Sequence, residues 1–189
     1  MRRTLVLLTL ACAALAAAGA GSASRAAPPR FAVWDLQRDL APASHDAYGD
    51  VKPWRNADAL AVRAPQATLV RCTFACGFGD GWFAFSRTPE LRTQDVVRGS
   101  VRAVELKGKT WAVTLRLTWR GLVRWRELSH AAERRMQKRG VPDVLVFVVH
   151  GTVVSAPFST NVRTRSRTVR IVDLRRTDAL QVANLLEAA

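Results

Sequence analysis

The pattern of apolar and polar positions predicts a β-hairpin in the second half of the chain. Residues 144–149 are all apolar and of strand length, and residues 152–154 form a second β-branched run after the dipeptide His150-Gly151. A two-residue turn between such runs is typical of a hairpin, and Gly151 can adopt the positive φ that the turn requires. Pro157 then ends the ladder, because proline has no N–H to donate.

Apolar residues at helical spacing predict a long helix over residues 121–138. The residues on its apolar face are Leu122, Trp125, Leu128, Ser129, Ala132 and Met136. Basic side chains crowd its last turns and Gly140 follows as a C-cap, which suits the negative end of the helix dipole. A second helix is expected to begin at Thr177 as its cap. Its inward face would consist of Ala179, Val182, Ala183 and Leu186.

The remaining segments predict strands joined by hairpins and loops. We expect strands at residues 31–35, 67–74, 82–86, 100–106, 110–118 and 168–174, short helices near residues 55–62 and 93–98, and mostly loop elsewhere in residues 37–66. Hairpins make such a sheet largely antiparallel. The expected fold class is therefore α+β, a largely antiparallel sheet with two main helices on one face.

The first 23 residues have the pattern of a secretory signal peptide. Arg2 and Arg3 precede an apolar run over residues 5–18 that is too short to span a bilayer, and small residues suited to signal peptidase follow. An uncleaved anchor and a lipid-modified Cys12 are the alternatives. We expect a secreted or envelope protein in which residues 24–90 form an N-terminal strand and loop region and residues 91–189 an α+β region.

Four motifs in the second half follow one another in the order found in a known family. They are PELRTQDV at 89–96, GLVRWRELS at 121–129, DVLVFVVHGTVVSAPF at 143–158 and TDALQVANLL at 177–186. Together they resemble the head of the first periplasmic domain of SecD, the accessory subunit of bacterial protein export, over about residues 82–187. The resemblance implies a SecD periplasmic-head-like fold and contact with emerging polypeptide. His150 departs from the family, which usually has Asp there.

Charge is distributed unevenly along the chain, whose formal net charge is +14. Residues 91–189 hold 19 basic and 8 acidic residues, whereas residues 21–90 hold 8 and 7. Such asymmetry favours an acidic partner such as a membrane surface or an anionic wall polymer. However, only four of the 29 basic residues are Lys, and heavy Arg and Ala use is also typical of a GC-rich genome.

The densest basic segment contains Arg163, Arg165, Arg167 and Arg170. In an extended chain the first three of these side chains project on one face. Guanidinium groups on one face can bind phosphate or carboxylate. This segment is therefore the candidate binding site, with a solvated loop as the alternative interpretation.

Two cysteines, Cys72 and Cys76, follow the leader. An even pair outside the cytoplasm favours a disulfide. Residues four apart on a straight strand lie roughly 13 Å from each other, whereas a disulfide needs about 4.4–6.8 Å between Cα atoms, so the bond requires residues 73–75 to turn. Two free thiols are the main alternative, and the spacing of a zinc site is absent.

Catalytic motifs do not stand out in the sequence. The histidines at positions 45, 130 and 150 are isolated, no serine lies in G-x-S-x-G, and the glycines at residues 77–81 lack the Lys of a phosphate loop. We expect a non-enzymatic extracytoplasmic binding module without cofactor or metal. A secreted hydrolase whose site assembles only in three dimensions is kept as a third alternative.

The expected partners of this module are unfolded or secreted polypeptide and translocase components. The surface expected to bind them is framed by the strand at 152–154, the basic loop and the helix that starts near Gly121. The alternative is a cell-envelope module that binds anionic polymer or lipid headgroups through its basic C-terminal half. The secretory leader argues against nucleic acid.

Overall fold

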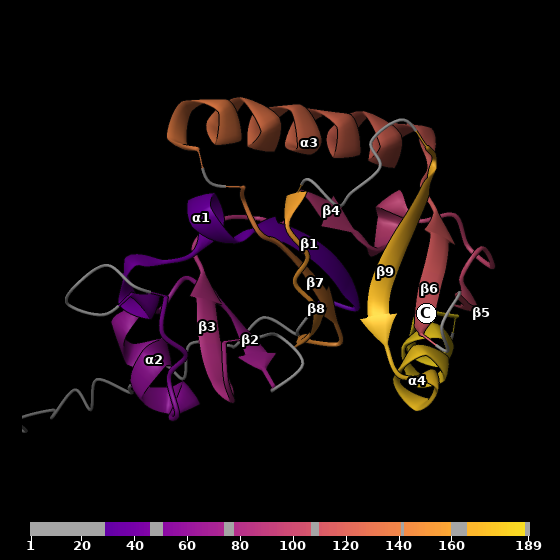
Figure 1. Cartoon of the computed structure of the whole chain (residues 1–189). Helices are drawn as coiled ribbons and strands as arrows, with labels where there is room; N and C mark the ends of the chain where they lie inside the picture. The colour runs from indigo at the N-terminus through magenta and orange to yellow at the C-terminus, as the bar shows by residue number, and fades with distance from the viewer. Residues whose placement is uncertain are drawn as a thin grey trace, which may run out of the picture.

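The computed structural model describes residues 29–45, 51–73, 78–106, 110–140, 142–159 and 166–187, whose strands form two sheets (Figure 1). The strands are β1 (Phe31–Asp35), β2 (Thr68–Cys72), β3 (Gly81–Phe85), β4 (Leu91–Arg92), β5 (Arg102–Glu105), β6 (Trp111–Arg116), β7 (Leu145–Val149), β8 (Thr152–Ser155) and β9 (Thr168–Leu174). The helices are α1 (Leu36–Asp39), α2 (Ala57–Arg63), α3 (Trp119–Arg139) and α4 (Arg176–Glu187), with 3-10 turns η1 (Pro42–Ser44) and η3 (Thr93–Asp95).

The larger sheet has six strands in the order β3-β2-β8-β7-β1-β4. Its pairs are antiparallel except for β2 and β8, which run parallel. Strand β1 lies between β7 and β4, and all five of its residues are buried. Strands from both sides of residue 90 therefore share one sheet, so the two regions expected from the sequence pack as a single unit.

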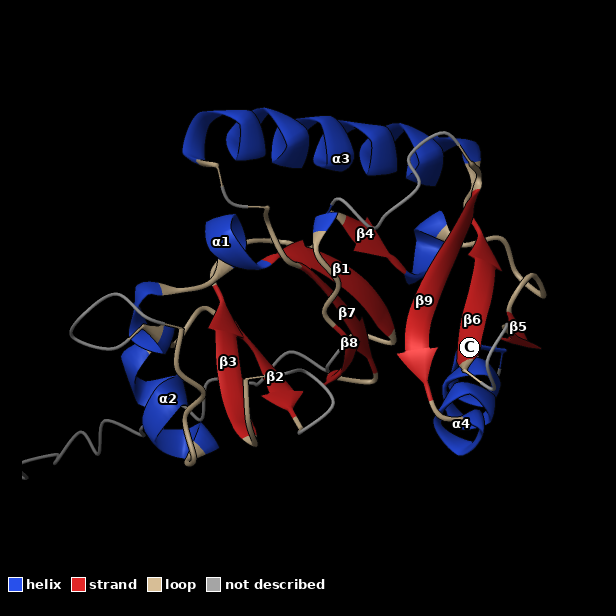
Figure 2. Cartoon of the chain, viewed as in Figure 1, coloured by secondary structure: helices blue, strands red, loops and turns tan. Residues whose placement is uncertain are grey.

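The smaller sheet, β5-β6-β9, faces the larger one across the main hydrophobic core. Alternate residues of β1 and β7 enter this core together with Val113 and Leu115 of β6 and Val169 and Ile171 of β9. Helices α3 and α4 close the core at opposite ends of the smaller sheet (Figure 2). A second core covers the other face of the larger sheet, where Trp34 stacks on Phe85 with ring centroids 4.7 Å apart.

The α+β fold class and its antiparallel strands are confirmed. Helix α3 has the predicted apolar face and the predicted C-cap, Gly140, at φ 72. The β7–β8 hairpin turns at His150 and Gly151 with φ values of 47 and 76. Positive φ at both turn positions matches the twist of the flanking strands, which explains the abrupt two-residue turn.

Three details differ from the sequence expectations. The strands divide into two sheets, whereas hairpin counting alone suggested one. Residues 37–66 contain α1 and η1 besides the expected short helix, because buried side chains of Leu36 and Leu40 anchor them. Helix α4 begins at Arg176, so Thr177 lies inside the helix and is not its cap.

Gly121 allows the first turn of α3 to pack directly on η3. A Cβ atom at this position would lie 2.4 Å from the backbone oxygen of Asp95 and 2.9 Å from the Cβ of Asp95. The same oxygen accepts a 2.8 Å hydrogen bond from the N–H of Thr118, and the Asp95 carboxylate accepts a 3.0 Å bond from Arg124. This close approach gives the Gly121 motif of the sequence a physical reason.

We expect Gly121→Ala to destabilise the protein. In an open helical site alanine is more favourable than glycine by about 0.5–1 kcal/mol, but overpacking costs about 1–3 kcal/mol, so the clash should dominate. Thermal unfolding should show a Tm several degrees lower, while Arg120→Ala at the neighbouring exposed position should change it little. A Tm equal to or above that of the parent protein would contradict this account of the helix contact.

Candidate functional site

A groove with a volume of about 830 Å³ runs between β8, β9 and α4. One wall is formed by Thr152, Val154, Ala156 and Pro157 of β8 and the residues that follow it. The opposite wall is formed by Val172 and Leu174 of β9 and by Val182 and Leu185 of α4. The lining is thus largely apolar, and the charged side chains of Arg175 and Asp178 lie at its exposed rim.

Strand β8 has an edge that is mostly free of ladder partners among the described strands. Its pairing with β2 consists of one residue pair, Arg71 with Thr152, so the residues after Thr152 separate from β2. Thr73, which follows β2, lines the groove. The parallel ladder therefore stops where the groove begins.

Strand β9 supplies the second free edge, because it is the outer strand of its sheet in the described part of the chain. Figure 1 shows β9 with β6 on one side and the β7–β8 hairpin on the other. Both strands that form the groove contain a bulge. In β8, Val154 is an extra residue in the pairing with β7, and in β9 the pairing with β6 shifts register between Ile171 and Leu174. Such bulges re-aim side chains and interrupt pairing.

The predicted binding surface is found only in part at this groove. Strand residues 152–154 line it as expected, but its helical wall comes from α4, whereas the sequence suggested α3. The histidine of the hairpin turn connects the two walls, since a ring nitrogen of His150 lies 3.3 Å from the carbonyl oxygen of Leu185. The free strand edges could not be read from the sequence, because they depend on which distant strands fail to pair.

Of the four predicted binding arginines, the structure describes Arg167 and Arg170. Arg163 and Arg165 lie outside the described residues. The guanidinium of Arg167 donates to the carbonyl oxygen of Leu117 at 3.2 and 3.3 Å, and Arg170 is exposed on β9, opposite Thr114. Neither of these two lines the groove.

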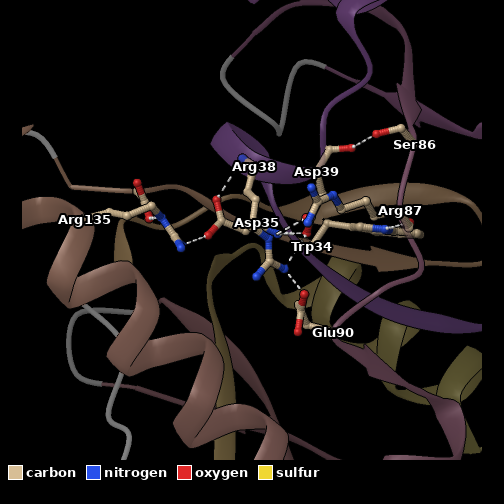
Figure 3. Close-up of polar contacts among 9 residues, drawn as sticks. Trp34, Asp35, Arg38, Asp39, Ser86, Arg87, Glu90 and Arg135 are labelled. Atoms are coloured by element: carbon tan, nitrogen blue, oxygen red, sulfur yellow. Dashed lines mark hydrogen bonds and ion pairs between the residues drawn. The ribbon is translucent and has the colours of Figure 1, made fainter.

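A buried cluster of three carboxylates lies at the junction of β1, α1 and α3. Its members are Asp35, Asp39 and Asp143, and Figure 3 shows the first two with their arginine partners. The guanidinium of Arg135 donates to Asp143 at 2.6 Å and also to Asp35. Arg38 donates to Asp39 at 2.8 and 3.2 Å and forms an ion pair with Glu90. Each buried acid therefore has a cationic partner, which is the arrangement of a structural ion network.

This cluster was not predicted from the sequence. Asp35 and Asp143 flank apolar strand segments, and a carboxylate at the end of a fully apolar run is the signal that could have identified it. Arg135 was assigned only to the helix dipole. Among the described residues no group of three His, Cys, Asp or Glu side chains is placed to hold a metal ion.

Burial raises the pKa of Asp35 from 3.8 to about 6; Arg135 opposes this shift, and the carboxylates of Asp143 and Asp39 add to it. A folded-state pKa above the unfolded value means that the folded protein holds a proton that the unfolded chain has already lost. The stability contributed by this group is therefore present at low pH and decreases as the pH rises through the interval between the two values.

We expect Asp35→Asn to remove this pH dependence. The difference in unfolding free energy, parent minus variant, should fall as the pH rises from 3.8 to about 6 and stay constant at higher pH. Urea denaturation of both proteins across pH 4–8 at constant ionic strength measures the difference. A difference that rises through this interval would contradict the raised pKa.

Cys72 is buried at the end of β2, and the antiparallel pairing of Cys72 with Gly81 shows that the chain reverses between them. The Sγ atom of Cys72 lies 3.0 Å from the carbonyl oxygen of Gly79. Cys76 itself lies outside the described residues, so the disulfide stays a prediction.

The test of this prediction is intact mass. Reduction should add two protons if Cys72 and Cys76 are joined, and alkylation of the denatured, unreduced protein should modify neither residue. Cys72→Ser and Cys76→Ser should each expose one alkylatable thiol. Two reactive thiols in the unreduced parent protein would rule out the bond.

No family model and no curated protein match this chain. Solved structures of SecDF resemble it. One, described as a membrane component that enhances protein export, matches with a TM-score of 0.43 and 22% identity over 55% of this chain and 42% of its own. A SecDF crystal structure in a super-membrane-facing form matches with the same score and identity over 54% of this chain and 12% of its own.

These matches agree with the SecD resemblance noted in the sequence motifs, and they concern the fold alone. The chain spans less than half the length of either SecDF structure. None of the described helices is long and apolar enough to cross a membrane.

Proposed function

We propose that this chain is an extracytoplasmic, non-enzymatic module that binds unfolded or secreted polypeptide in the groove between β8, β9 and α4. The observation that carries the proposal is the pair of free strand edges on either side of an apolar groove. An extended peptide can add to such an edge, with main-chain hydrogen bonds supplying affinity and flanking pockets accepting alternate side chains. An exposed strand edge presents unpaired N–H and C=O groups, which are a template for pairing with another chain.

The dimensions of the groove suit a short extended segment. A strand rises about 3.3 Å per residue, so the seven residues of β9 offer an edge of roughly 23 Å. The groove volume of about 830 Å³ falls in the range of roughly 300–1,000 Å³ that is typical of ligand sites. Because nine of the sixteen lining residues are apolar and main-chain hydrogen bonds do not read side chains, we expect weak binding with little selectivity for peptide sequence.

The leader-like N-terminus and the SecD-like motifs support the choice of ligand. A module that is exported from the cytoplasm meets secreted chains before they fold, and such chains expose apolar segments. Translocase components are the further partners that the motif resemblance suggests. Catalysis is not required: His150 contacts the backbone of α4, and Ser155 is buried, so these two groups do not form a nucleophile–base pair in the described part of the chain.

The test compares two exposed leucines of α4. Leu185 lines the groove and is 36% exposed, whereas Leu180 is 42% exposed and does not line it. Leu185→Glu should weaken binding of an unfolded secretory protein about tenfold, a change of about 1.4 kcal/mol, because a charge replaces apolar lining. Leu180→Glu should leave binding unchanged. Fluorescence anisotropy of a labelled, reduced substrate measures both, with its folded form as a control.

Two outcomes would reject the proposal. One is equal binding, or no binding, of the folded and unfolded forms of the substrate. The other is an equal loss in the two leucine variants, which would assign the effect to added negative charge on a basic protein. Circular dichroism of each variant confirms that α4 remains folded.

A further inference from the structure

An exposed tryptophan lies at the corner where β6 leads into α3. Trp119 is 66% exposed, and Val123, one helical turn later, is 40% exposed. Both residues are exposed on α3, whose buried residues include Leu122 and Trp125. An exposed indole is costly in water unless it meets a partner, since Trp carries a large apolar surface.

Arginines lie close to this apolar pair along the chain. Arg116 and Arg120 are exposed at the end of β6 and the start of α3. Arg167 is fixed beside them, because its guanidinium donates to the carbonyl oxygen of Leu117 and its own carbonyl oxygen accepts from the N–H of Leu117 at 2.7 Å. We name the set of Trp119, Val123, Arg116, Arg120 and Arg167 the α3 corner.

The acidic residues near the α3 corner do little to offset its charge. Asp95 is buried and paired with Arg124. Glu127 is exposed one turn beyond Val123. On the smaller sheet the register places Arg170 opposite Thr114, on the same face as Arg116 two residues further along β6, so the positive surface continues from the corner onto this sheet.

We propose that the α3 corner docks on a lipid bilayer that carries anionic headgroups. Tryptophan favours the boundary between headgroups and acyl chains, where its ring is apolar and its N–H is hydrated. Basic residues near an anionic bilayer are attracted by its negative surface potential. A soluble polyanion would bind the arginines, but it offers no apolar region that could bury the side chains of Trp119 and Val123. The combination therefore favours a bilayer, and it is independent of the polypeptide groove.

The experiment is co-sedimentation of the exported protein with vesicles of phosphatidylcholine alone or mixed with phosphatidylglycerol. Binding should require phosphatidylglycerol and weaken from about 0.05 M to about 0.3 M salt, as screening shortens the range of the charges. Trp119→Ala and Arg120→Gln should each lower the partition coefficient about fivefold. Arg139→Gln, an exposed arginine at the opposite end of the same helix, and Val62→Ala, an 81% exposed valine on α2, are the matched controls.

Each remaining outcome overturns the proposal. An equal loss of vesicle binding in Arg120→Gln and Arg139→Gln would assign the binding to the net charge of the whole protein and not to the α3 corner. Unchanged vesicle binding in Trp119→Ala, together with weaker heparin retention in Arg120→Gln, would assign the surface to a soluble polyanion. Vesicle binding that does not depend on phosphatidylglycerol would exclude the arginines as its cause. Tm values of all variants exclude loss of folding as an explanation.

Discussion

The position of α3 depends on one partly buried arginine. Arg135 reaches from the C-terminal part of the helix into the junction below it and pairs with Asp35 at the end of β1 and with Asp143 before β7. Removing one partner of a buried ion pair costs roughly 3–5 kcal/mol in proteins, because the remaining charge is left without compensation. At its other end the helix is held by the Gly121–Asp95 contact and by the Thr118 cap. Two polar anchors therefore set the direction of α3 across the core.

This arrangement determines the rest of the architecture. The carboxylate of Asp35 also caps α1 by accepting from the N–H of Arg38 at 3.3 Å, so the central strand, the short helix and the long helix share one polar junction. Because β1 pairs with both β7 and β4, the same junction fixes the middle of the larger sheet. The smaller sheet packs on β1 and β7 through the main core, and its strand β9 also contacts β8. The groove lies beside this contact, between β8, β9 and α4.

Much of the local structure could be predicted, because the signals for α3 and for the β7–β8 hairpin lie within a few residues of each other. The split into two sheets and the pairing of the buried acids could not, since each depends on contacts between distant segments. The Thr118 cap of α3 is a local contact, because its side chain accepts from the N–H of Gly121 at 3.1 Å, so the sequence does contain that signal. Asp35 and Arg135 are 100 residues apart, and nothing in either neighbourhood indicates the other. The candidate site was predictable only as far as residues 152–154. Its second wall arises because β9 joins β6 rather than β8, a choice of partner that strand propensity does not encode.

The two proposed surfaces lie at opposite ends of the smaller sheet, where Figure 2 shows α3 and α4. The α3 corner is continuous with the end of β6, whereas the wall of the groove is formed by α4 and the end of β9. Contact of the corner with a bilayer would therefore leave the groove facing away from the lipid. A segment bound there would be held at some distance from the membrane, roughly the length of a seven-residue strand. Such a geometry permits both contacts at once, so membrane attachment and polypeptide binding need not compete.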